Sequence, residues 1–252
     1  HLFKLMREGP EDELKLTENA QPAIMAHALA VFAALTRDGG VELRKAAQFV
    51  AGHSLGEYSA LCAAGSLGLA NTAKLLKIRG KAMQAAVPVD VGAMAALLGA
   101  DLELAQKIAA AAAEREVCAV ANDNDPSQVV ISGHKAAIDR AIELAKEMGA
   151  KRAVPLPVSA PFHCSLMQPA ADAMSDALSY EVLNAPEVPL FANVTAAPTS
   201  DPDTIRGQLV EQVTGMVRWR ESVEAMAAAG VIHFVEFGGK VLGPMVKRIG
   251  PD

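Results

Sequence analysis

A serine between two glycines is the residue of this chain best placed to perform chemistry. It lies in the run GHSLGE at residues 52–57, between the apolar stretch 46–50 and a helical pattern. Glycines at this spacing permit a sharp strand-to-helix turn, which would hold the Ser54 hydroxyl at its tip beside free helical N–H groups. The pattern predicts a nucleophile for acyl transfer, with the Leu55 N–H as the first donor to an oxyanion.

The same stretch allows a structural alternative. Ser54 and Glu57 have the S-x-x-E spacing of a capping box, in which the hydroxyl caps a helix and performs no chemistry. The two flanking glycines favour the nucleophile over the cap.

A nucleophilic serine needs a base, and His163 is the candidate. It lies in a loop just ahead of a helix expected to run to about residue 178. A single loop histidine is more often structural, so its role as base depends on the role of Ser54.

Arg79 is a cation on the apolar side of a helix expected at 71–86. Its neighbours on that stripe are Leu75, Ala82, Met83 and Ala86. A guanidinium does not lose its proton, so it must pair with a carboxylate, extend to solvent at the end of its aliphatic chain or bind an anionic ligand. The residues alone leave these alternatives open.

The elements that must position these groups alternate along the chain. A helix at 18–37, with Ile24, Ala28, Val31 and Leu35 on one apolar face, precedes a strand at 46–52 and a helix at 56–65. The last third is expected to add a strand at 190–194, helices at 202–213 and 221–229, and a strand at 231–237. Such alternation predicts a three-layer α/β core with a parallel-rich sheet, formed by residues 1–88 and 160–252.

A second unit interrupts this core at residues 89–159. Strands are expected at 94–98, 117–122, 128–132 and 152–157, and helices at 101–114 and 134–148, with the polar run 122–126 as a hairpin loop. The order β-α-β-β-α-β is that of a ferredoxin-like subdomain.

Composition excludes several classes of protein. The formal net charge of −6 over 252 residues argues against nucleic-acid binding, and no uninterrupted apolar stretch reaches the length of a membrane span. The three cysteines, with no C-x-x-C spacing, favour free thiols in a reducing compartment over a disulfide framework or a zinc site. We therefore expect a cytoplasmic protein with no metal or other cofactor.

Six stretches together resemble the malonyl-CoA:acyl-carrier-protein transacylases of fatty-acid synthesis and, more distantly, the acyltransferase domains of polyketide synthases. In chain order, they are residues 17–23, 52–61, 79–83, 128–134, 155–167 and 239–242. The resemblance implies a hydrolase-like core and an acyl group carried on Ser54, with His163 as base. It also implies that Arg79 pairs with the malonyl carboxylate and that the Gln212 carbonyl orients the His163 ring.

The resemblance implies further substrate contacts and partners. Leu55, Met83 and Phe162 are expected to line the substrate. The expected partners are malonyl-CoA and a phosphopantetheinylated acyl carrier protein. This chain is expected to be a monomer. An acidic carrier needs a basic surface, for which Lys151 with Arg152, or Lys240, Lys247 and Arg248, are the candidates.

The chain departs from the family pattern at two places. The family begins with a strand and a Gly-Gln-Gly-Ser-Gln loop that supplies a second oxyanion N–H. No such loop precedes Ser54, and roughly forty residues of the pattern are expected ahead of His1. The loop at 237–240 is also one residue shorter than the family's Gly-Pro-Gly-Lys.

Two other functions remain as alternatives. An α/β serine hydrolase or thioesterase would need another base, for which His233 is the candidate, although it lies in the apolar run 231–237. A non-catalytic domain that binds a carrier protein is the third possibility.

Overall fold

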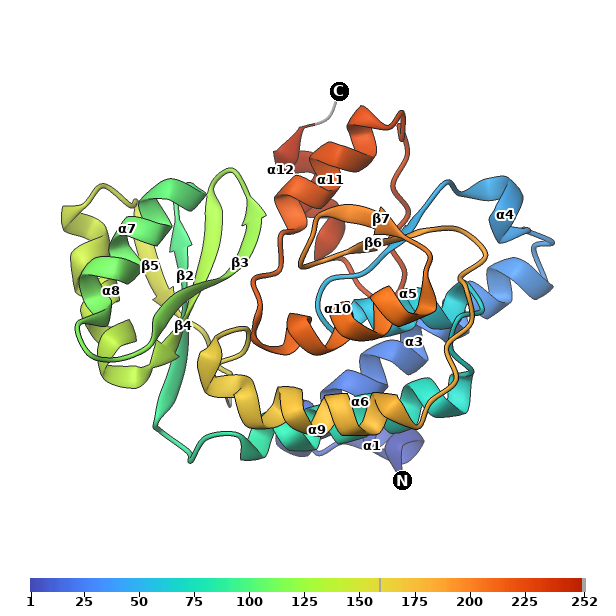
Figure 1. Ribbon diagram of the computed structural model, residues 1–252, viewed down its shortest axis with the longest axis horizontal. Helices are drawn as coiled ribbons and strands as arrows, with labels where there is room; N and C mark the ends of the chain where they lie inside the picture. The colour runs from blue at the N-terminus through green and yellow to red at the C-terminus, as the bar shows by residue number, and fades with distance from the viewer. Residues whose placement is uncertain (159, 251–252) are drawn as a thin grey trace.

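The computed structural model describes residues 1–158 and 160–250, which form a mixed α/β fold with two β-sheets (Figure 1). Ser159, in the stretch 155–167, and residues 251–252 lie outside the described residues. The first segment leads through the serine turn and contains α1 Leu2–Glu8, α2 Glu11–Lys15, α3 Thr17–Arg37, α4 Leu43–Ala46, β1 Val50–Ala51, α5 Gly56–Ala63 and α6 Leu69–Ala85.

The middle segment forms the larger sheet and two helices on one of its faces. Its elements are β2 Gly92–Leu98, α7 Leu102–Ala113, β3 Cys118–Asp125, β4 Gln128–His134, α8 Lys135–Glu147 and β5 Arg152–Pro155. The strand order is β3-β4-β2-β5, and every neighbouring pair is antiparallel. Ala95, Leu97 and Ile131 of the sheet are buried with Ile108 of α7 and Ile138 of α8, because alternate side chains of a strand face the same side.

The last segment returns to the first. It contains the short 3₁₀ turn η1 Ser165–Met167, α9 Gln168–Ser179, β6 Leu190–Ala192, β7 Ala197–Thr199, α10 Pro202–Thr214, α11 Trp219–Ala228 and α12 Leu242–Ile249. β6 pairs parallel with β1 and antiparallel with β7. The expected parallel-rich sheet is therefore wrong for the described residues, whose named strands include a single parallel pair.

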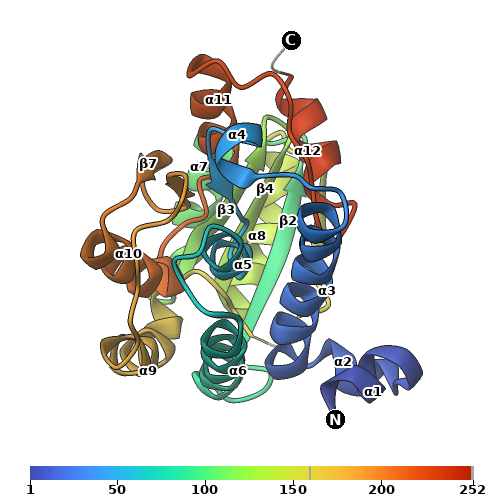
Figure 2. The same ribbon diagram turned by 90° about the vertical axis from the view of Figure 1, so that its right-hand side faces the viewer.

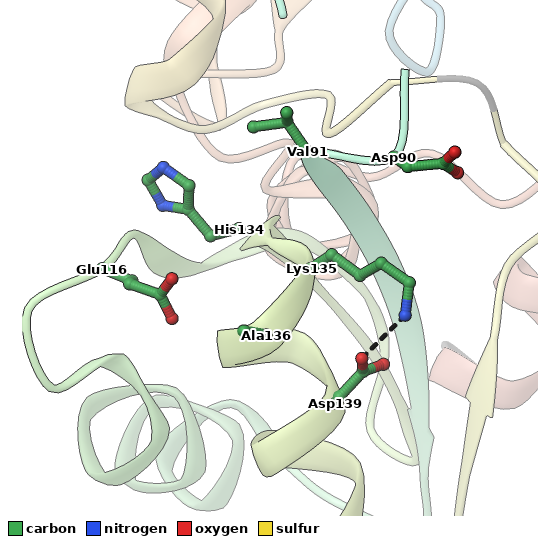
Figure 3. A pocket seen from close by; sticks show the side chains of 7 residues that line it. All are labelled: Asp90, Val91, Glu116, His134, Lys135, Ala136 and Asp139. Atoms are coloured by element: carbon green, nitrogen blue, oxygen red, sulfur yellow. Dashed lines mark hydrogen bonds and ion pairs between the residues drawn. The ribbon is translucent and has the colours of Figure 1, made fainter. Parts of the chain in front are cut away.

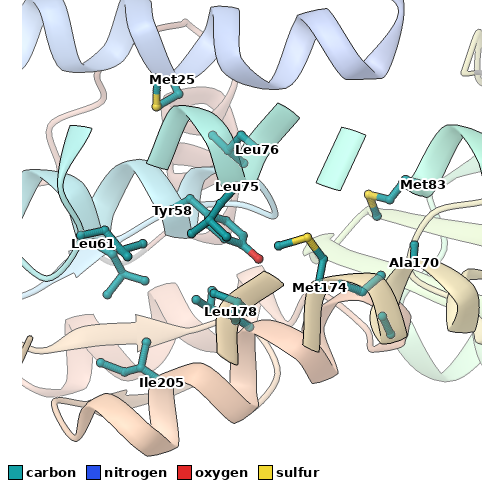
Figure 4. Packing of buried hydrophobic residues seen from close by; sticks show 14 of the residues in the cluster. Met25, Tyr58, Leu61, Leu75, Leu76, Met83, Ala170, Met174, Leu178 and Ile205 are labelled. Carbon is teal, nitrogen blue, oxygen red and sulfur yellow. The ribbon is translucent and has the colours of Figure 1, made fainter. Parts of the chain in front are cut away.

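The main core packs helices around α5, the helix that follows the serine turn. Tyr58 and Leu61 of α5 are fully buried with Leu75 of α6 and Met174 and Leu178 of α9 (Figure 4). α5 also contacts α3 and α6, and Figure 2 shows it beside α3 and above α6. Burial of these large apolar side chains, at about 1.5–3 kcal/mol each, fixes the helix on which the serine turn depends.

Two expected elements differ from the structure. The apolar stripe of α3 is buried at Ala28 alone, whereas Ile24, Val31 and Leu35 are 47%, 41% and 38% exposed. The run 231–237 forms no strand, because no described strand lies alongside to complete its hydrogen bonds. A helical period shows which residues share a face, and an apolar run shows a tendency to be buried. Neither pattern shows whether another element packs against that face or pairs with that run.

The polar run 122–126 also differs from its expected hairpin loop. β3 continues through Asp125, and the side chains of this run bind the other part of the molecule. Asp123 pairs with Arg220 and Asp125 with Arg248, each at 2.8 Å between nitrogen and oxygen. The Val217 N–H and C=O bond to Ala121 and Asp123, which attaches the larger sheet to the segment before α11.

Candidate active site

Ser54 occupies a tight turn between β1 and α5, as the two glycines predict. Its φ of 55° lies in the left-handed region, which residues other than glycine rarely adopt. A Cβ atom on Gly52 would lie 2.0 Å from the carbonyl carbon of Gly56, so the crossing of the chain at this turn requires glycine. The turn thus matches the geometry of a nucleophile elbow.

His163 meets Ser54 across 109 residues of sequence. Its Nε2 lies 2.8 Å from Ser54 Oγ, and its Nδ1 lies 2.8 Å from the Gln212 carbonyl oxygen and 3.2 Å from that of Gly215. Because carbonyls only accept hydrogen bonds, Nδ1 must carry the ring proton in the neutral imidazole. Nε2 is then the acceptor, free to take the proton of the serine hydroxyl.

The imidazole is held in its neutral form. Burial, together with the positive charge of Arg79, lowers the pKa of His163 to about 3, against the two carbonyl hydrogen bonds that raise it. The side chain is 4% exposed. A base of this kind stays unprotonated, and so able to accept a proton, at any pH well above 3.

Arg79 lies inside the same cluster and is only 1% exposed. Its Nη1 donates to Gln21 Oε1 at 2.7 Å, while Nη2 donates to Gln212 Oε1 at 2.9 Å and to Ser54 Oγ at 3.1 Å. Its Nε is buried without a hydrogen-bond partner. Among residues 1–158 and 160–250, Arg79 forms no ion pair with a carboxylate within 4.0 Å.

This environment bears on the alternatives for Arg79. The side chain neither reaches water nor pairs with a described carboxylate, and a buried cation without a counter-ion costs several kcal/mol. The guanidinium, with one donor still free, therefore has the properties of a binding site for an anionic group beside Ser54.

The capping-box alternative is wrong. α5 begins at Gly56 with Leu55 as N-cap, and no side chain caps it. Ser54 Oγ bonds instead to His163 and Arg79. The Glu57 carboxylate accepts from the Asn193 N–H at 2.6 Å and from Gln212 Nε2. Burial raises the pKa of Glu57 to about 8, although these two donors and Arg79 lower it.

The other expected site residues are placed at different distances from the chemistry. No hydrogen bond from the Leu55 N–H is found among the described residues, which leaves it free for an oxyanion. Met83 is buried, and its sulfur accepts from Gln21 Nε2 at 3.6 Å, while the oxygen of the same amide accepts from Arg79. Phe162, next to His163, is partly buried against both the main core and the inner face of the larger sheet. His233 is exposed in the run 231–237.

Residues without a role in the sequence reasoning complete the site. Asn193 accepts the Ser54 N–H at 2.7 Å and donates to the Gly52 carbonyl at 2.8 Å. His53 Nε2 donates to Asn124 Oδ1 of β3 at 2.8 Å. Gln21 belongs to the stretch 17–23 that carries the family resemblance, and only this resemblance could have pointed to it as a site residue. No sequence pattern indicates Asn124 or Asn193, because their contacts with the serine turn span 71 and 139 residues of the chain.

A surface cavity on the larger sheet is separate from this cluster. It has a volume of about 350 Å³ and is lined by Asp90, Val91, Glu116, His134, Lys135, Ala136 and Asp139 (Figure 3). Within the part of the chain that the structure describes, no group of three His, Cys, Asp or Glu residues could hold a metal ion. No helix there is long and apolar enough to cross a bilayer.

Comparison with known proteins assigns this arrangement to a family. A model of the acyl transferase domain matches residues 1–238. The malonyl CoA-acyl carrier protein transacylases of Escherichia coli K12 and Bacillus subtilis are 47% and 42% identical, over 98% of this chain and 79% and 77% of their own lengths.

Solved structures agree with the sequence relatives. The acyl-carrier-protein S-malonyltransferase of Bartonella henselae is 54% identical, with a TM-score of 0.96 over 100% of this chain and 80% of the other. A type II PKS acyl-carrier protein in complex with its malonyl-transacylase is 40% identical, with a TM-score of 0.94 over 98% of this chain and 79% of the other.

Proposed function

This chain belongs to the malonyl-CoA:acyl-carrier-protein transacylases, within the acyl transferase domain family, and on that premise we propose that Ser54 carries the malonyl group between the two substrates. The reaction moves malonyl from malonyl-CoA to the phosphopantetheine thiol of acyl carrier protein in fatty-acid synthesis. The observation that carries the role of Ser54 is its 2.8 Å contact with a histidine nitrogen that is free to accept a proton.

The first half-reaction forms an ester on the serine. Ser54 Oγ attacks the thioester carbonyl carbon as its proton passes to His163 Nε2. The oxyanion that forms would lie beside the Leu55 N–H at the N-terminal end of α5, where partial positive charge favours it. When the carbon–sulfur bond breaks, His163 returns the proton to the sulfur of coenzyme A.

The second half-reaction runs the same steps in reverse with a different thiol. The phosphopantetheine sulfur gives its proton to His163 and attacks the ester carbonyl, and Ser54 leaves with that proton. The Gln212 carbonyl keeps the imidazole in one tautomer throughout, since it accepts from Nδ1 at 2.8 Å. These steps use only side chains and main-chain groups of the chain, and we propose that the enzyme works without a cofactor.

Arg79 would hold the free carboxylate of malonate in both halves. Its free Nε and the absence of a described counter-ion support this role. In the same proposal, Met83 and Phe162 form apolar walls around the acyl group. Gln21 contacts both Met83 and Arg79, and Phe162 directly precedes His163 in the chain.

We also propose the finer architecture expected from the sequence: a three-layer hydrolase-like core of residues 1–88 and 160–252, with a ferredoxin-like subdomain at 89–159. The strand order β3-β4-β2-β5, with α7 and α8 on one face, supports the subdomain. A monomer that works in the cytoplasm remains a prediction.

Basic side chains are proposed to form the surface that meets the acyl carrier protein. Lys151, Arg152, Lys240 and Lys247 are exposed and available to an acidic partner. Arg248 is a weaker candidate, because its guanidinium already binds the Asp125 carboxylate.

The proposed function is tested by the mass of the intact chain after mixing with malonyl-CoA. We expect a stable increase by one malonyl group, which is lost to the thiol when acyl carrier protein is added. A transient adduct lost to water would favour the hydrolase. No adduct, with the carrier protein still bound, would favour the binding domain.

Replacing Arg79 by alanine is expected to change acyl selectivity more than chemistry. Malonyl-CoA should lose about 10²- to 10³-fold in kcat/KM, because its carboxylate would enter a buried site without a cation. Acetyl-CoA, which has no such carboxylate, should lose far less, so the ratio of acetylated to malonylated enzyme rises.

Intact mass after competition between the two thioesters measures this ratio. Lys81→Ala, on the exposed side of the same helix, is the matched control and should leave the ratio unchanged. Equal losses for both acyl groups would mean that Arg79 serves the structure and not the malonyl carboxylate.

A further inference from the structure

Glu57 is a buried carboxylate that the proposed chemistry does not use. It lies three residues after Ser54 in the first turn of α5 and is 1% exposed. One of its oxygens accepts from the Asn193 main-chain N–H at 2.6 Å, and the other accepts from Gln212 Nε2. Both partners are neutral N–H groups far along the chain, one from the residue that follows β6 and one from α10.

These two partners hold the peptide groups on both sides of Ser54. The Asn193 side chain accepts the Ser54 N–H at 2.7 Å, and Gln212 Nε2 donates to the Ser54 carbonyl at 2.9 Å. Ser54 has a φ of 55°, so its backbone needs such support to stay in an unfavourable conformation. The serine turn is thus fixed by two amides that both depend on one carboxylate.

Gln212 also touches the other two members of the site. Its main-chain oxygen accepts from His163 Nδ1, and its Oε1 accepts from Arg79 Nη2 at 2.9 Å. A side-chain amide can point either way, with oxygen and nitrogen exchanged. In the structure both Glu57 oxygens accept N–H groups, and this selects the orientation with Nε2 toward Glu57 and leaves Oε1 to receive Arg79.

We propose that Glu57 is a positioning residue for acyl transfer, which orients the Gln212 amide and anchors Asn193 so that Ser54 is held in line with His163 and Arg79. Glu57 touches none of the reacting atoms and acts only through these two residues. The inference rests on the proposed function, because its effect is measured as formation of the acyl-enzyme.

Glu57→Gln tests the inference with almost no change in volume. Glutamine offers one acceptor oxygen and one NH₂ group, so one of the two N–H donors loses its acceptor. In single-turnover malonylation followed by intact mass, the limiting rate constant should fall about 10- to 100-fold, because small misplacements of reacting groups have effects of this size. The half-saturating concentration of malonyl-CoA should change by less than about threefold, since no donor of Arg79 is removed.

Two controls separate positioning from loss of stability. Glu181→Gln replaces another buried glutamate, whose partner is Lys74, and should keep the wild-type rate. If Glu57 acts through Gln212, adding Gln212→Ala to Glu57→Gln should slow acylation much less than Gln212→Ala slows the wild type. That substitution retains the main-chain carbonyl that binds His163.

Three outcomes would overturn the inference. They are a folded Glu57→Gln variant with the wild-type limiting rate, fully additive effects of the two substitutions, and a loss of rate that only follows the loss of folded protein. Should Glu57→Gln fail to fold, Glu57→Asp keeps the carboxyl group but shortens the reach, and a wild-type rate there would overturn the inference equally. Failure of the wild type to form any acyl-enzyme would instead reject the proposed function.

Discussion

Replacement of Ser54 by alanine is expected to abolish the malonyl adduct and to lower transfer to acyl carrier protein by about 10⁴-fold or more, because no other group is placed to form the ester. The fold should be retained. Alanine has no more bulk than serine and meets the same strain at a φ of 55°, so the cost in stability is that of the hydrogen bonds of one hydroxyl, about 1 kcal/mol.

Intact mass and a thermal melt measure both parts of this expectation. Ser59→Ala, five residues away in α5, is the matched control and should be acylated like the wild type. A covalent malonyl group on the Ser54→Ala chain would show that the nucleophile lies elsewhere.

Removal of the His163 imidazole is expected to slow acylation by about 10³- to 10⁴-fold at neutral pH, since the serine would then lack its base. Added imidazole should restore part of the rate by entering the space that the side chain leaves. The wild type, whose base has a pKa of about 3, should acylate at a similar rate across about pH 5 to 7, and not lose activity as a histidine of ordinary pKa gains its proton.

Stopped reactions analysed by mass at several pH values measure this effect. His233→Ala is the informative companion, because a hydrolase with that base would lose its activity there instead. A wild-type rate in His163→Ala would contradict the assignment of the base, and a fall in wild-type rate centred near pH 6.5 would contradict the lowered pKa of His163.

The local geometry of the site could be predicted from sequence, because it depends on neighbouring residues. The glycines at 52 and 56 predict the turn, and Arg79 on an apolar helical face predicts a buried cation. The pairing of Ser54 with His163 followed from chemical need and from family resemblance, not from any local pattern.

What could not be predicted depends on partners far along the chain. The sequence of β3 is polar because Asp123, Asn124 and Asp125 meet groups on the opposite part of the molecule, and a polar run by itself is typical of a loop. The S-x-x-E spacing suggested a capping box, since nothing nearby shows that Glu57 binds residues 136 and 155 positions away.

The contact between His53 and Asn124 connects the larger sheet to the serine turn. His53 precedes the nucleophile directly, and Asn124 belongs to a strand whose two neighbouring carboxylates bind Arg220 and Arg248. For protein engineering, the larger sheet therefore cannot be exchanged without regard to these contacts. A graft from another acyltransferase would preserve the serine turn only if its own strand at the position of β3 supplied groups that bind the same histidine and both arginines.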